Sequence, residues 1–117
     1  MKKFLLSFLM VISMLSVSAV ADLRGADSDV KGSVSSVRDR TREIFKQQGI
    51  VQTGSSSENS GLEQTIKGRK GSLEVEVKIQ STGKNETHVD VIAKQQGALS
   101  WNKDFAQNLL SKIIQTG

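Results

Sequence analysis

The sequence predicts an α+β fold with two layers, in which an antiparallel meander of three to four strands carries N-terminal and C-terminal helices packed on one face. Apolar residues recur at a helical spacing in residues 29–48 and again in residues 101–114. Between them, apolar and polar residues alternate in residues 73–79 and 89–93, which is typical of strands that bury one face. Two amphipathic helices and a half-apolar sheet can bury their apolar surfaces together.

The first 21 residues have the three parts of a cleavable secretory signal peptide. Two lysines precede an apolar run, and Ala19 and Ala21 supply the small residues that the signal peptidase requires. We expect cleavage between Ala21 and Asp22, with cleavage after Ala19 as the second choice. A retained membrane anchor is the alternative to a cleaved signal peptide. A spanning helix needs about 20 apolar residues, whereas this run is shorter and is interrupted by serines. The protein is therefore expected in the periplasm or outside the cell, with no transmembrane segment after signal removal.

Composition limits what the exported part can be. The chain has 16 Lys and Arg residues against 12 Asp and Glu, and two of the basic residues lie in the signal peptide. The excess of basic over acidic residues in the rest of the chain is too small to indicate a nucleic-acid partner. Because there is no cysteine, neither a disulfide nor a lipid-modified N-terminal cysteine is possible. We expect a flexible leader at residues 22–28 and one domain at residues 29–117.

The first helix is predicted over residues 29–48. Val30, Val34 and Val37 begin its apolar stripe, Ser28 or Asp29 would cap its first turn, and Gly49 stands where a left-handed C-terminal cap belongs. The last helix is predicted to start after Ser100 as its N-cap. Its stripe runs through Trp101, Phe105, Leu109, Leu110, Ile113 and Ile114. Trp101 is therefore expected to pack against the sheet.

The strands are predicted between these helices. Residues 50–53 are β-prone but short, so the sequence leaves open whether they form a true strand, and residues 54–61 are predicted to be a loop. In the first hairpin, a turn at Arg69-Lys70 would set Ile66 opposite Leu73. In the second, a loop at residues 82–86 would set Ser81 opposite Thr87, with Lys78 facing Asp90 across the polar face.

His88, the only histidine, is the one candidate for chemistry. It is predicted on the polar face of the sheet, where Glu74, Glu76, Gln80 and Asp90 can also lie. A general base needs an orienting partner and a nucleophile within reach, and strand alternation alone explains why these polar residues share a face. No catalytic residue, metal site or cofactor is therefore assigned.

A basic row on the first helix is the candidate binding site. Arg38, Arg42 and Lys46 are four residues apart and so share one side of the helix. Such a row can meet the phosphate groups of an anionic envelope surface. Asp39 and Glu43 partly neutralise it, and an ordinary solvated helix face is the alternative interpretation.

The order of elements also resembles a known family. A helix ending in IFKQQGI, the alternating stretch GSLEVEVKIQSTGKNETHVDVIAK and the closing helix FAQNLLSKII are similar to small bacterial envelope proteins of unknown function, many of them lipoproteins. The resemblance covers nearly the whole chain after the signal peptide, and it implies an envelope location but no catalytic residues. The absence of a lipobox cysteine departs from the lipoprotein members.

The sequence therefore predicts an exported module that binds without catalysis. Its partner would be another envelope protein or an anionic envelope surface. The alternative is a small hydrolase or metal-dependent enzyme that uses the sheet face around His88.

Overall fold

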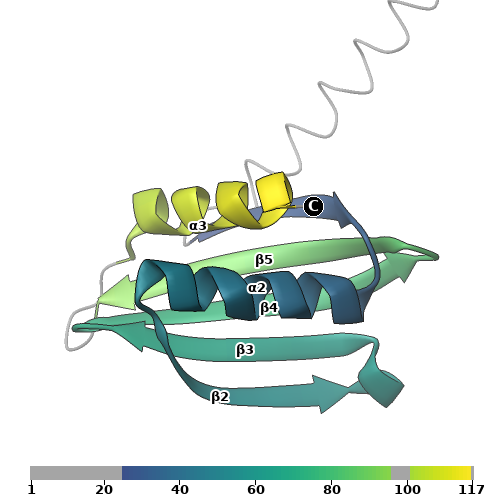
Figure 1. The fold of residues 1–117 in the computed structure, drawn as a ribbon, viewed down its shortest axis with the longest axis horizontal. Helices are drawn as coiled ribbons and strands as arrows, with labels where there is room; N and C mark the ends of the chain where they lie inside the picture. The colour runs from purple at the N-terminus through teal and green to yellow at the C-terminus, as the bar shows by residue number, and fades with distance from the viewer. Residues whose placement is uncertain (1–24, 96–100, 117) are drawn as a thin grey trace, which may run out of the picture.

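The computed structural model describes residues 25–95 and 101–116. They form a five-stranded antiparallel sheet and two α-helices (Figure 1). The elements in chain order are β1 (Gly25–Lys31), α2 (Val34–Gln48), β2 (Val51–Glu58), the short 3₁₀ helix η1 (Asn59–Gly61), β3 (Glu63–Lys70), β4 (Leu73–Gly83), β5 (Glu86–Gln95) and α3 (Lys103–Thr116). The α+β class and the antiparallel sheet are as predicted, but the sheet has five strands rather than three or four. The predicted signal peptide, its cleavage site at Ala21 and Asp22, and the predicted cap Ser100 lie outside the described residues.

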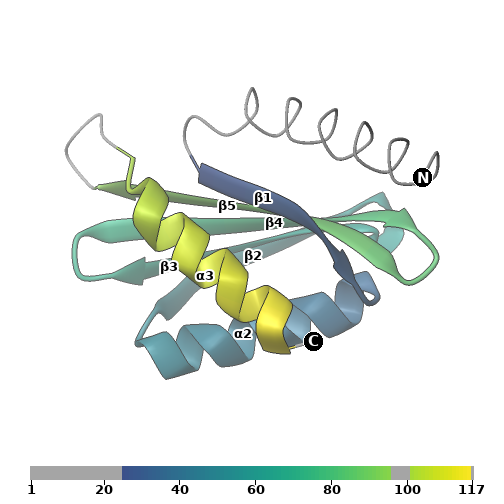
Figure 2. The same ribbon diagram turned by 90° about the horizontal axis from the view of Figure 1, so that it is seen from above.

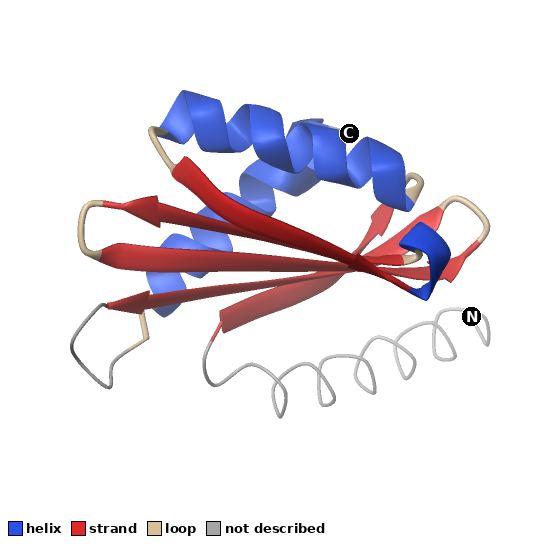
Figure 3. Ribbon diagram, turned by 90° about the horizontal axis from the view of Figure 1, so that it is seen from below, coloured by secondary structure: helices blue, strands red, loops and turns tan. Residues whose placement is uncertain are grey.

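Both helices lie on the same face of the sheet (Figure 3). The strand order is β1-β5-β4-β3-β2, so β1 and β2 form the two edges, and α2 crosses the sheet to connect them. Helix α3 contacts β1 and β5, and its C-terminal end lies next to α2 (Figure 2). The core between helices and sheet includes Val37, Ile44, Phe45, Ile66, Val75, Val77, Ile79, Val89, Val91, Ala93, Ala106 and Ile113, all at most 2% exposed.

The N-terminal part of the domain differs from the prediction. Residues 25–28, which were expected in a flexible leader, and residues 29–31, which were expected in the first helix, together form the edge strand β1. Helix α2 begins at Val34, and its N-cap is Ser33, whose hydroxyl accepts a hydrogen bond from the Ser36 N–H at 3.2 Å. Ser28 and Asp29 therefore do not cap it. The predicted C-terminal cap at Gly49 is confirmed, with φ of 71°.

One of the two predicted hairpin registers is confirmed. Ser81 lies opposite Thr87 and Lys78 opposite Asp90, as predicted, although Gly83 also pairs with Glu86 after a bulge and shortens the loop. The other register is wrong.

In the β3–β4 hairpin, the turn is at Gly71-Ser72 rather than Arg69-Lys70, and Ile66 lies opposite Val77 rather than Leu73. Gly71 has φ of +60°, a left-handed conformation that glycine adopts without steric cost. The shift is by an even number of residues, so the buried face is the same in both registers.

Strand β2 extends through the serine-rich run that was expected to be a loop. It pairs with β3 from Val51 to Glu58, with a bulge between Gln52 and Gly54. All of its residues are exposed except Gly54, which is half-buried. Because neither face of β2 is buried, no alternation of apolar residues marks it in the sequence.

Gly68 gives a direct test of the packing between α2 and the sheet. A Cβ atom added to Gly68 would lie 2.6 Å from the Ile50 side chain and 2.8 Å from the Phe45 ring, both of which belong to the buried core. We expect Gly68→Ala to lower the free energy of unfolding by about 1–3 kcal/mol through overpacking. The matched control is Gly54→Ala, whose Cβ would meet nothing within 4 Å. Equal urea midpoints for the two variants would contradict this packing.

Candidate functional site

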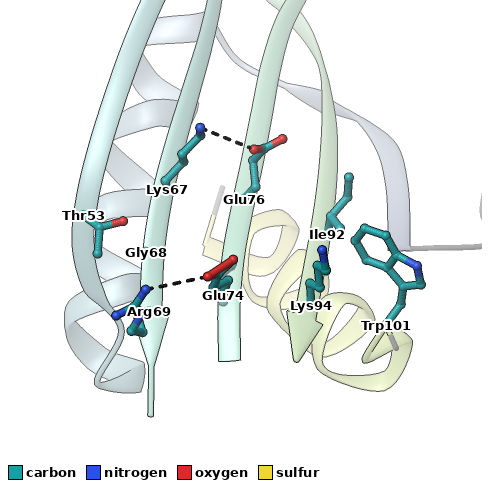
Figure 4. A pocket seen from close by; sticks show the side chains of 10 residues that line it. Thr53, Lys67, Gly68, Arg69, Glu74, Glu76, Ile92, Lys94 and Trp101 are labelled. Atoms are coloured by element: carbon teal, nitrogen blue, oxygen red, sulfur yellow. Dashed lines mark ion pairs between the residues drawn. The ribbon is translucent and has the colours of Figure 1, made fainter. Parts of the chain in front are cut away.

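The face of the sheet opposite the helices carries a shallow groove at one end (Figure 4). The groove has a volume of about 450 Å³ and runs across the strands from β2 to Trp101. Its lining residues are Thr53, Lys67, Gly68, Arg69, Glu74, Val75, Glu76, Ile92, Lys94 and Trp101. This volume is within the usual range of ligand sites, roughly 300–1,000 Å³.

Strand register places the charged residues of the groove in rows. Lys67 lies opposite Glu76, and Arg69 lies opposite Glu74, on adjacent strands β3 and β4. The side chains form ion pairs of 4.0 Å and 3.6 Å respectively, marked in Figure 4. All four side chains are at least 38% exposed. Such surface pairs contribute at most about 1 kcal/mol each, so a ligand can replace them at little cost.

Trp101 lies at the end of the groove and not in the core. It forms an isolated bridge with Lys94 of β5, and the Asn102 N–H donates to the Ala93 carbonyl oxygen at 2.8 Å. The Lys94 Nζ lies 5.7 Å from the centroid of the indole ring, within the range of a cation–π contact. The residue is 38% exposed. The open face thus presents an aromatic surface beside a cation.

The prediction that Trp101 begins the last helix is wrong. Helix α3 starts at Lys103, and the Asn102 side-chain oxygen accepts a hydrogen bond from the Phe105 N–H at 3.0 Å. Asn102 therefore caps the helix, and Trp101 precedes the cap in an extended segment. Its spacing of four residues from Phe105 continued the helical stripe by coincidence. The exposed groove end that results was not foreseen from the sequence.

His88 is held between two carboxylates at the other end of the open face. Its Nε2 lies 3.0 Å from Asp27 Oδ2, and its Nδ1 lies 2.8 Å from Asp29 Oδ1. Asp29 pairs directly with His88 across β1 and β5, and Asp27 lies two residues earlier on the same face. His88 thus connects the edge strand β1 to the sheet. Gln80 of β4 lies opposite His88, on the face where it was expected. The two carboxylates that contact the ring, however, come from the segment that was predicted as leader and helix start.

The two carboxylates change the protonation of His88. Partial burial disfavours the charged ring, but the hydrogen bonds and negative charges of Asp29 and Asp27 outweigh it and raise the pKa above its ordinary value of 6.5. In the imidazolium form both ring nitrogens donate, so neither can act as a general base. Because the nitrogens point in opposite directions, a metal ion bound at one of them would meet only one of the two aspartates.

The basic row of α2 lies on the opposite layer from the groove. Arg38 is paired with its neighbour Asp39 at 3.2 Å, Arg42 is half-buried and Lys46 is exposed. Arg40, which was not part of the predicted row, instead donates hydrogen bonds to the carbonyl oxygens of Lys31 and Ile113 and so joins α2 to β1 and α3. The structure does not bring Arg38, Arg42 and Lys46 together with the polar side chains of the open face.

Comparison with known proteins adds no family. No protein-family model matches the sequence, and no curated protein matches it. In the described parts of the chain, no group of three or more His, Asp or Glu side chains is placed to hold a metal ion. No helix among the described residues is long and apolar enough to cross a membrane.

The contacts of Asp27 and Asp29 with His88 make the free energy of unfolding depend on pH. Since the folded pKa is raised, the contribution of His88 is complete below the unfolded value of 6.5 and is lost as the pH rises through the folded pKa. Loss of the proton also removes the positive charge of His88 from a site where Asp27 lies opposite Asp90. We expect a lower thermal midpoint at pH 8 than at pH 6.

The control is His88→Gln, which keeps a polar side chain but cannot become charged. Its thermal midpoint should change much less between pH 6 and pH 8 than that of the wild type. The same pH dependence in both proteins would contradict the assignment of the effect to His88.

Proposed function

We propose that the protein is an exported, non-enzymatic binding module of the bacterial cell envelope, which holds a segment of a partner protein in the groove on the open face of its sheet. The proposal rests mainly on one observation: Trp101 lies on that face beside Lys94 and Ile92, at the end of a groove about 450 Å³ in volume. A large aromatic side chain that is more than a third exposed is typical of a binding surface.

The charges of the groove favour a particular kind of partner. Three cations and two carboxylates line it, and both carboxylates are already paired with Lys67 and Arg69. Lys94 has its ammonium group over the Trp101 ring. A partner segment with an apolar side chain against Trp101 and an acidic side chain at Lys94 would satisfy both groups. The groove therefore suits an acidic, partly apolar peptide segment.

The geometry supports binding better than catalysis. Both nitrogens of the only histidine are within 3.0 Å of carboxylate oxygens, an arrangement that supports a structural role for His88. The proposed envelope location rests on the signal-like N-terminus, with two lysines, an apolar run and the Ala19–Ala21 pattern, and on the resemblance to small envelope proteins.

Site-specific photocrosslinking in cells tests the proposal. A photoreactive residue at position 94 or 53 would stand in the groove, and one at exposed Ser35 on α2 would stand on the opposite layer. We expect a discrete protein adduct from positions 94 and 53 but not from position 35. The adduct formed from position 94 should be lost when Trp101→Ala is combined with the probe, because the aromatic contact is removed.

Two outcomes would contradict the proposal. Adducts from position 35 alone would assign binding to the helical layer, where the basic row of Arg38, Arg42 and Lys46 lies. Adducts that carry the chain with residues 1–21 still attached would contradict export with signal cleavage, which predicts a chain that begins at Asp22.

A further inference from the structure

The two edges of the sheet differ in how far they are protected against pairing. An edge strand exposes unpaired N–H and C=O groups, and proteins usually block such edges with charges, proline or a covering element. Strand β1 carries Asp27, Asp29 and Lys31 and lies under α3. Strand β2 has no lysine, the chain has no proline, and neither helix overlaps β2 in Figure 1. In the part of the chain that the structure describes, the β2 edge is thus available for a further strand.

A bulge limits the part of β2 that can pair regularly. The register with β3 shifts between Gln52 and Gly54 and is continuous from Gly54 to Glu58. In that stretch Gly54, Ser56 and Glu58 lie on the open face, because their partners on β3 are Lys67, Thr65 and Glu63. An added strand would therefore meet a segment of regular register with only small side chains and one carboxylate.

We propose that β2 pairs with β2 of a second copy of this chain, antiparallel and about a two-fold axis at Ser56. This register sets Ser56 opposite its own symmetry mate and Glu58 opposite Gly54 of the second copy. It is isologous, so it closes as a dimer with one continuous ten-stranded sheet and does not continue into a filament.

Charge complementarity favours a second copy of the chain as the partner, and antiparallel pairing of the two β2 strands. Glu58 of one copy lies opposite Gly54 of the other, and the register partner of Gly54 is Lys67. Strands are about 4.8 Å apart, so the Glu58 and Lys67 side chains must span two such spacings. Gly54 has no side chain between them, and a Cβ there would meet nothing within 4 Å. Antiparallel pairing thus forms two equivalent Glu58–Lys67 pairs, whereas parallel pairing would place like charges together.

The existing contacts of Lys67 and Glu58 do not prevent the pairing. Lys67 is 60% exposed and its ion pair with Glu76 is long, at 4.0 Å. Glu58 is exposed, and among the described residues it forms no ion pair. Neither α2 nor α3 overlaps β2 in Figure 1, so the helices leave the outer edge of β2 open to a second β2.

Sedimentation of the purified protein over a range of concentrations tests the proposal. We expect a monomer–dimer equilibrium, which Ser56→Lys abolishes because it places two lysines against each other on the two-fold axis. The matched control is Ser35→Lys, the same change at an exposed position of α2, which should leave the equilibrium unchanged. Circular dichroism should show that both variants remain folded.

A charge swap tests the register. Glu58→Lys and Lys67→Glu should each raise the dimer dissociation constant about tenfold, since two equivalent pairs change at once, and the double variant should restore it. Glu43→Lys and Lys46→Glu, at exposed positions of α2, are the charge-matched controls. A protein that stays monomeric at all concentrations, or a dimer that survives Ser56→Lys, would overturn the proposal.

Discussion

One-sided burial of the central strands β4 and β5 is the constraint on which the rest of the structure depends. On one face, Val75, Val77, Val89 and Val91 are at most 2% exposed beneath the two helices. The alternate residues on the other face are almost all charged or polar, and no described element covers them. Without disulfides, this single layer of aliphatic packing must offset the conformational entropy lost on folding. The uncovered face is therefore free to carry binding groups that add nothing to the core.

The charges on the uncovered face are not evenly distributed. Lys67, Arg69 and Lys94 gather at the end near Trp101, whereas Asp27 and Asp29 lie at the opposite end. At the acidic end, protonated His88 neutralises part of the negative charge of the two aspartates and connects β1 to the sheet. At the basic end, the cations border a groove with an aromatic side chain. The same polarity along β2 and β3 underlies the charge complementarity that we propose between two copies.

The sequence predicted those strands and helices correctly in which apolar residues follow a single spacing, either every second residue or every three to four residues. The β4–β5 register followed from strict alternation and from opposite charges at Lys78 and Asp90. Strand β1 was missed because Ala26, Val30 and Val34 are four residues apart, a spacing that satisfies a strand followed by a helix as well as one longer helix. Since Asp27 and Asp29 were thereby placed outside the sheet, their contacts with His88 could not be predicted.

The groove was missed for a related reason. Trp101 is four residues before Phe105 and so fitted the helical stripe. The residue that caps the start of α3 is Asn102, one of several polar residues in that segment that could serve as an N-cap. Strand β2 left no signal because its side chains are exposed on both faces. The candidate site thus depends on a feature that only the three-dimensional arrangement reveals, namely an aromatic residue that lies outside the core.

The most direct test of a one-sided core with Trp101 outside it is quenching of the fluorescence of this single tryptophan by ions. The account predicts that iodide quenches the emission of the native protein readily and caesium much less, because the Lys94 ammonium group, 5.7 Å from the ring centroid, attracts anions and repels cations. Emission that resists both ions until the protein is unfolded would place Trp101 in the core and contradict the account.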